Sequence, residues 1–130
     1  MTVLNNEARA LFTGPNIAHI ATLLPDGGPH SVPVMIDVEG DHLAFFTSPD
    51  SRKVRNLVAD DRIAISVVDR ENLVRTAVVR GRVVERIGGD AGWEIVDRIF
   101  AKYTGGPYPR GEEREVFLVA PAHVIVPTYR

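Results

Sequence analysis

The sequence contains no cysteine, only two lysines, and no apolar run that approaches the ~20 residues of a membrane-spanning helix. Without cysteine the chain cannot form a disulfide, a thiolate nucleophile or a thiolate metal site. Its first residues also lack the basic start and the long apolar stretch of a signal peptide. We therefore expect a cytoplasmic protein with no disulfide and no membrane anchor.

Charge and motif content argue against several other classes of function. A formal net charge of −2 gives no general attraction to nucleic acid or to an anionic membrane, so any cationic site must be a local cluster. The four histidines lack the paired spacing of metal ligands. The sequence also has no P-loop, no G-x-S-x-G and no alternation of aromatic and basic residues. We expect no metal and no nucleic-acid partner.

The chain suits one domain spanning residues 1–130, since 45% of its residues are hydrophobic and can form a core. Alternating apolar residues and turn sequences predict antiparallel strands, and Gly81 is expected to mark a bulge or a bend. Strands are predicted at 17–24, 29–38, 42–47, 62–68, 73–86, 115–119 and 123–127, and helices at 5–13, 51–59 and 90–103. About seven antiparallel strands with short helices predict a mainly β fold that closes, or nearly closes, into a barrel.

Residues 45–57 read FFTSPDSRKVRNL and place basic residues where a helix disfavours them. After a turn sequence, Arg52, Lys53 and Arg55 crowd the first turn of the predicted helix. A helix N-terminus carries a partial positive charge and free N–H donors, so each cation there costs a few tenths of a kcal/mol. A bound phosphate would turn these cations into partners, together with the N–H groups and the Ser51 hydroxyl. The pattern indicates a phosphate pocket.

A plainer interpretation of the same segment also stands. The cations could point into solvent and pair with Asp50, Asp60 or Asp61, as most runs of charge do. Under either interpretation we expect Ser48 or Asp50 to cap the helix. Ion pairs between these cations and acidic residues in the structure would favour the solvated interpretation, and their absence would favour the phosphate pocket.

The order of these segments resembles a known superfamily. Residues 20–36 (IATLLPDGGPHSVPVMI), 43–69 (LAFFTSPDSRKVRNLVADDRIAISVVD) and 74–85 (VRTAVVRGRVVE) are similar to the pyridoxamine 5′-phosphate oxidase-like split-barrel superfamily, and within it to the flavin/deazaflavin oxidoreductases of actinobacteria. The similarity covers about residues 12–86. KYTGGPYPR and FLVAPAHVIV, nearer the C-terminus, are similar to the group that uses the deazaflavin coenzyme F420. The resemblance implies a split β-barrel homodimer that holds a flavin or deazaflavin in a groove at the subunit interface.

The resemblance also implies which residues hold the cofactor. The segment at 51–53 would grip the cofactor phosphate, the end of the strand at 46–47 would contact the same cofactor, and the strand at 31–36 would lay its backbone along the ring system. Thr76 would reach the cofactor from the long strand. The residues implied to bind the cofactor are Ser31, Val32, Pro33, Val34, Met35, Ile36, Phe46, Thr47, Ser51, Arg52, Lys53, Asn56 and Thr76.

Two departures from the pyridoxamine phosphate oxidases themselves narrow the expectation. Those enzymes carry an arginine where this chain has Ser31 and a lysine where it has Ile36, so both positive charges are absent. The arginine-rich pyridoxal phosphate pocket near the C-terminus is also missing. We therefore do not expect oxidation of pyridoxamine phosphate, and a less cationic groove is compatible with F420, whose long acidic tail can leave towards solvent.

The leading hypothesis from the sequence is an F420-dependent oxidoreductase that passes a hydride between the reduced deazaflavin and a small conjugated or aromatic electrophile. The alternatives are an FMN-binding oxidoreductase of the same fold, and a non-catalytic protein that binds F420, haem or another tetrapyrrole. No side chain is nominated as a catalytic acid or base, because the cofactor carries the redox chemistry. The proline- and glycine-rich loop from Tyr103 to Arg110 could cover the groove or serve as a plain connector.

Overall fold

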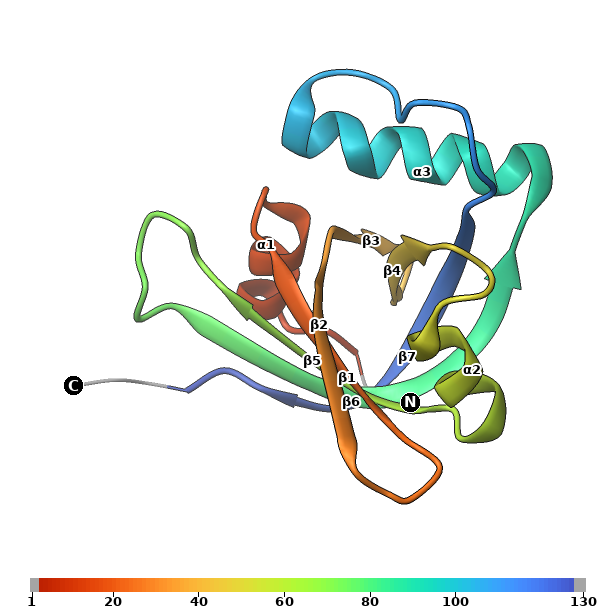
Figure 1. Cartoon of the computed structure of the whole chain (residues 1–130). Coiled ribbons are helices and arrows are strands. Elements are labelled where there is room, and N and C mark those ends of the chain that lie inside the picture. Colours follow the sequence, from red (N-terminus) through yellow and green to blue (C-terminus); the bar gives the residue numbers. More distant parts are fainter. Residues whose placement is uncertain (1–2, 128–130) are drawn as a thin grey trace.

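The computed structural model describes residues 3–127, which form seven strands and three helices around a curled sheet (Figure 1). The helices are α1 (Asn6–Thr13), α2 (Arg52–Ala59) and α3 (Gly89–Thr104). The strands are β1 (Ala18–Leu23), β2 (Pro29–Val34), β3 (Ile36–Glu39), β4 (His42–Thr47), β5 (Arg62–Val68), β6 (Thr76–Ile87) and β7 (Glu115–Ile125). None of the helices in this part of the chain is long and apolar enough to cross a bilayer.

The strands form one antiparallel sheet in the order β2-β1-β5-β6-β7-β4-β3. β2 and β3 lie at opposite edges of this sheet, yet only Met35 separates them in the chain. The sheet must therefore curl until its two edges nearly meet, as Figure 1 shows. This arrangement confirms the predicted split barrel.

The corner at Met35 corrects one prediction, because residues 29–38 were expected to form a single strand. The N–H group of Ile36 donates to the Tyr103 hydroxyl at 3.2 Å instead of continuing the ladder of β2. Beyond this point the partner changes: β2 pairs with β1, and β3 pairs with β4. The hydrogen bond from Ile36 to Tyr103 of α3 thus marks the point where β2 ends and β3 begins.

Pro121 was expected to separate two final strands, but β7 is continuous from Glu115 to Ile125. β6 and β7 shift register between Arg80 and Gly81, where Gly81 faces Pro121. A Cβ atom on Gly81 would lie 2.2 Å from the Ala120 carbonyl oxygen, so only glycine lets the two backbones approach this closely. The predicted bulge at Gly81 is confirmed, and the bend that it permits keeps β7 in one piece.

Two apolar clusters hold the fold together. The larger fills the barrel, where Phe45 and Phe117 stack with ring centroids 5.4 Å apart and α1 contributes Leu11 and Phe12. The smaller lies between α3 and the other faces of β4 and β7, and it includes Ile99 and Val116. Both sides of β4 and β7 are therefore covered, which explains their nearly continuous buried residues.

Candidate functional site

The predicted phosphate segment lies where β4 ends and α2 begins. Ser51 is the N-cap of α2: its hydroxyl accepts from the Val54 N–H group at 3.4 Å. The prediction that Ser48 or Asp50 would cap the helix is wrong. The buried Thr47 hydroxyl donates to the same Ser51 oxygen at 3.4 Å, which ties the end of β4 to the start of the helix. The N–H groups of Arg52 and Lys53 have no acceptor among residues 3–127.

The cations around this helix start have no acidic partner within 4 Å in residues 3–127, although Asp50 lies two positions before Arg52 in the sequence. No ion pair of Arg52, Lys53 or Arg55 is found in the described part of the chain. Asp60 and Asp61, which the plainer interpretation assigned to these cations, are paired with other arginines at 2.6 and 2.5 Å. The two arginines are exposed, whereas Lys53 is half-buried. The structure therefore leaves a group of uncompensated cations here, with Lys53 the most enclosed.

A further cation, which sequence reasoning missed, lies beside this group. Burial first, and the nearby Arg114 guanidinium second, lower the pKa of Lys53 below its ordinary value of 10.5. Arg114 precedes Glu115, which faces Thr47 across the β4–β7 ladder. Only this strand register brings Arg114 to the start of α2, so no local pattern in the sequence could have found it.

The loop between α3 and β7 turns back along α3 (Figure 1). Arg110 forms a bidentate ion pair with Asp97, at 2.9 and 2.8 Å, and its guanidinium lies 3.9 Å from the centroid of the Trp93 ring. This pairing lowers the pKa of Asp97. The Tyr108 ring packs edge-on against Phe46, with centroids 5.4 Å apart. The loop is thus fixed to α3 and to the end of β4, next to the phosphate segment.

The segment predicted to line the ring system divides at the corner of the barrel. Ser31 and Pro33 are exposed on β2, an edge strand whose free backbone groups can bind a ligand. Val32 is half-buried, and Met35 packs against the α3 cluster near Phe46. The side chains of Val34 and Ile36 belong to the barrel core. These placements leave the backbone of β2 and the side chains of Ser31 and Pro33 as the accessible parts of the segment.

The Ile36 backbone is already engaged by α3. Its carbonyl accepts from the Lys102 ammonium at 2.5 Å and its N–H group donates to Tyr103. Desolvation lowers the pKa of Lys102 and raises that of Tyr103. These contacts stabilise the corner of the barrel and do not leave Ile36 free for a ligand.

Two other predicted residues lie apart from the phosphate segment. Asn56 is 2% exposed and its amide donates to the Thr22 hydroxyl at 3.0 Å, so within the chain it joins α2 to β1. Thr76 begins β6 and pairs with Val68, the last residue of β5, whereas Arg62, just after α2, is the first residue of β5. The six residue steps between them correspond to about 20 Å. Within one chain Thr76 therefore lies far along the sheet from Arg62, which follows the end of α2.

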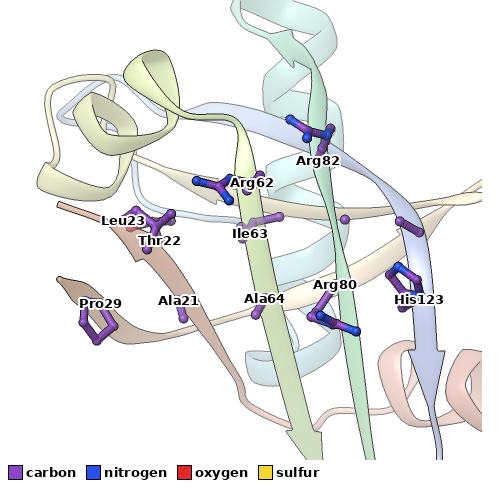
Figure 2. A pocket seen from close by; sticks show the side chains of 12 residues that line it. Ala21, Thr22, Leu23, Pro29, Arg62, Ile63, Ala64, Arg80, Arg82 and His123 are labelled. Carbon is purple, nitrogen blue, oxygen red and sulfur yellow. The ribbon is translucent and has the colours of Figure 1, made fainter. Parts of the chain in front are cut away.

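Two cavities in the described part of the chain lie away from the phosphate segment. One of about 420 Å³ lies against β1, β5, β6 and β7, where Arg62, Arg80, Arg82 and His123 border it (Figure 2). Another, of about 280 Å³, includes Thr76 and lies beside α1. No group of three or more potential metal ligands occurs within residues 3–127. The candidate site is therefore an open cationic edge, formed by the start of α2, the end of β4 and Arg114.

Comparison with known proteins places this geometry in a family. The profile of the pyridoxamine 5′-phosphate oxidase family matches residues 4–126. A solved F420 reductase structure is 27% identical with a TM-score of 0.83, over 94% of this chain and 98% of that chain. No protein with a curated description matches significantly.

Two further solved structures share the fold at lower identity. HupZ of Group A Streptococcus is 20% identical with a TM-score of 0.72, over 95% of this chain and 94% of that chain. A conserved hypothetical protein from Mycobacterium tuberculosis is 20% identical with a TM-score of 0.74, over 95% of this chain and 84% of that chain. The family profile spans almost the whole described chain and the curled sheet is the same in these structures, so the chain belongs to the pyridoxamine 5′-phosphate oxidase family of split barrels.

Proposed function

We propose that this protein is an F420-dependent oxidoreductase that transfers a hydride between the deazaflavin and a small conjugated or aromatic electrophile. One observation carries the proposal: cations without acidic partners gather where two N–H groups of α2 are free. A phosphate or phosphodiester meets both requirements, because it accepts hydrogen bonds and neutralises the charges. The similarity to an F420 reductase over 94% of the chain supports this choice of cofactor.

The phosphate subsite is built from residues that the fold already orients. Ser51 is fixed by its bonds to Thr47 and to the Val54 N–H group, so the free N–H groups of the next two residues have a set direction. The Lys53 ammonium is half-buried near them, where a charge-assisted bond is stronger than in bulk water. Phe46 and the β2 backbone would border the ring system. When bound, the deazaflavin supplies the hydride chemistry, and the chain supplies binding and orientation.

Ser31 and Ile36, which replace an arginine and a lysine of the pyridoxamine phosphate oxidases, argue against pyridoxamine phosphate as the substrate and are compatible with F420 as the cofactor. Ile36 is fully buried in the core, so no side chain at this position presents a cation to a ligand. Ser31 is exposed on β2 and offers only a hydroxyl. A groove without these charges suits a long acidic tail that extends into solvent better than it suits a compact, tightly clamped phosphate ester. FMN, with the same phosphate chemistry and a shorter tail, remains the alternative cofactor.

The position of Thr76 supports a homodimer as part of the proposal. Within one chain Thr76 is about 20 Å of strand away from Arg62, the residue that starts β5 soon after α2 ends. A second copy packed against the sheet can bring its own Thr76 to this edge and close the groove over the cofactor. In this arrangement residues 1–130 form a single cofactor-binding domain, and each groove uses residues of both subunits.

The test is to titrate the purified protein with F420 and with FMN and to follow cofactor fluorescence. Micromolar F420 binding with much weaker FMN binding supports the proposal, and the reverse order favours the FMN alternative. Reduced F420 should then be oxidised by a member of a panel of enones, quinones and nitroaromatics. Binding without oxidation across the whole panel would instead favour a non-catalytic F420 or tetrapyrrole carrier.

Variants of the phosphate subsite test its residues directly. Arg52→Ala and Lys53→Ala should each weaken cofactor binding by about 1–3 kcal/mol, the range for one lost charge-assisted contact. Arg9→Ala is the matched control, because Arg9 is half-exposed on α1 beside the β3–β4 turn, and its pair with Asp41 at 3.8 Å is a surface contact. Equal affinity in the double variant and the control would remove this segment from the site.

A further inference from the structure

We propose that Arg114 is a second fixed cation of the phosphate subsite and that Tyr108 positions it there. This inference rests on the proposed function, since it concerns the same ligand group. It adds a residue from the segment between α3 and β7, which the sequence did not connect with α2. The ligand class is a phosphate monoester or diester held between the Lys53 ammonium and the Arg114 guanidinium.

Strand pairing brings the two residues together. Glu115 pairs with Thr47 in the β4–β7 ladder, and Thr47 is bonded to the cap of α2. Arg114 is the residue just before this pair, so its side chain starts beside the first turn of the helix. Burial is the larger cause of the lowered pKa of Lys53, and the Arg114 guanidinium is the second, which agrees with this placement.

The Arg114 side chain is held in place. Its Nε donates to the Tyr108 hydroxyl at 3.1 Å, and its guanidinium carbon lies 5.3 Å from the centroid of the Tyr108 ring. Tyr108 is itself packed against Phe46 and Phe100, with centroid distances of 5.4 and 4.9 Å. Only 17% of the Arg114 side chain is exposed. An arginine fixed in this way loses little entropy when it binds a phosphate.

Arg114 keeps donors free for a ligand. One Nη1 hydrogen goes to the Glu113 carbonyl at 2.7 Å, while Nη2 donates to no residue in the described part of the chain. The acidic group beside it, Glu112, is 3.5 Å away and has 78% of its side chain exposed. Because the Glu112 carboxylate is largely solvated, it compensates the Arg114 charge only weakly. The charges of Arg114 and Lys53 therefore repel each other, and an anion between them would relieve the repulsion.

Arg110, in the same loop, differs from Arg114 because an acidic partner neutralises it. Asp97 neutralises it through two hydrogen bonds, and it stacks on Trp93. Its contacts explain the fixed shape of the loop and leave little capacity for another anion. Of these two arginines, Arg114 is the one suited to bind phosphate.

The experiment compares each cofactor with its phosphate-free form: FMN with riboflavin, and F420 with the deazaflavin that lacks the phosphate tail. Arg114→Gln should weaken binding of the phosphorylated forms about 10- to 100-fold, as for one lost charge-assisted contact, and leave the phosphate-free forms within about twofold. Arg114→Lys should restore part of the loss, because the charge returns. Tyr108→Phe should weaken the phosphorylated forms about threefold or more by releasing the guanidinium. A purely structural role would change both forms of a cofactor alike.

The outcomes separate this inference from the proposed function. If the wild-type protein binds a phosphorylated cofactor and Arg114→Gln or Tyr108→Phe leaves the preference for the phosphorylated form unchanged, only the role of Arg114 is overturned. If the wild-type protein binds neither F420 nor FMN, the proposed function fails. Inorganic phosphate then serves as the probe: it should shift the Lys53 NMR signal in the wild-type protein and not in Arg114→Gln. Equal shifts in both proteins, or none, would overturn the inference.

Discussion

Replacing Tyr103 by phenylalanine should destabilise the corner where the barrel nearly closes. The Tyr103 hydroxyl accepts from the Ile36 N–H group at 3.2 Å and donates to the Asn16 carbonyl at 2.7 Å. Both residues are buried, with 0% and 5% of their surface exposed. The substitution removes one oxygen atom and leaves a donor and an acceptor unpaired. The Ile36 carbonyl keeps its bond to Lys102 and adds no loss.

The magnitude follows from these two groups. A buried polar group without a partner costs about 1–3 kcal/mol, so the pair should lower the free energy of unfolding by about 2–6 kcal/mol. For a domain of this size each kcal/mol corresponds to roughly 3–5 °C in the melting temperature. Urea unfolding followed by circular dichroism measures the free energy, and a thermal melt measures the temperature.

Tyr108→Phe is the matched control for this prediction. It removes the same atom, but among residues 3–127 the Tyr108 hydroxyl accepts only from Arg114, and the ring is half-buried near the surface. Its free energy of unfolding should therefore fall by less than about 1 kcal/mol. The reasoning would be refuted if Tyr103→Phe were no less stable than this control, or lay within about 0.5 kcal/mol of the wild-type protein.

Three further substitutions test the fold around the site. Gly81→Ala forces a Cβ atom against a backbone oxygen at 2.2 Å and should cost more than about 2 kcal/mol by urea unfolding, whereas Gly111→Ala, with nothing within 4 Å, should change stability little. Thr22→Val leaves the buried Asn56 amide without its acceptor and should cost about 1–3 kcal/mol, which a further Asn56→Leu substitution should partly restore. Hydrogen bonds from its arginine partner lower the pKa of Asp60 to about 2, so its stabilisation is complete above about pH 4 and is lost as the pH falls through 2. The difference in unfolding between Asp60→Asn and the wild-type protein at pH 6 should therefore shrink as the pH falls from 4 to below 2; a constant difference would contradict the assignment.

Local chemistry in the sequence was sufficient to predict most elements of the fold. Strand alternation predicted β1, β4 and β5 to within a residue or two, and Gly81 predicted the bulge. The errors arose where a distant residue determines the backbone path. Tyr103 interrupts the strand expected at 29–38, and the close approach of β6 at Gly81 carries β7 past Pro121. The periodicity of apolar residues shows which side of a strand or helix is buried, and it contains no information about contacts with residues far along the chain.

The candidate site divides in the same way. The sequence by itself determined the cations at the start of α2, because their position in a helix is a local property of residues 51–59. Only the tertiary structure decided that Asp60 and Asp61 are paired elsewhere and that Arg114 joins Lys53. These decisions depend on strand register, which sets the neighbours of residues 61 positions apart through backbone hydrogen bonds and core packing.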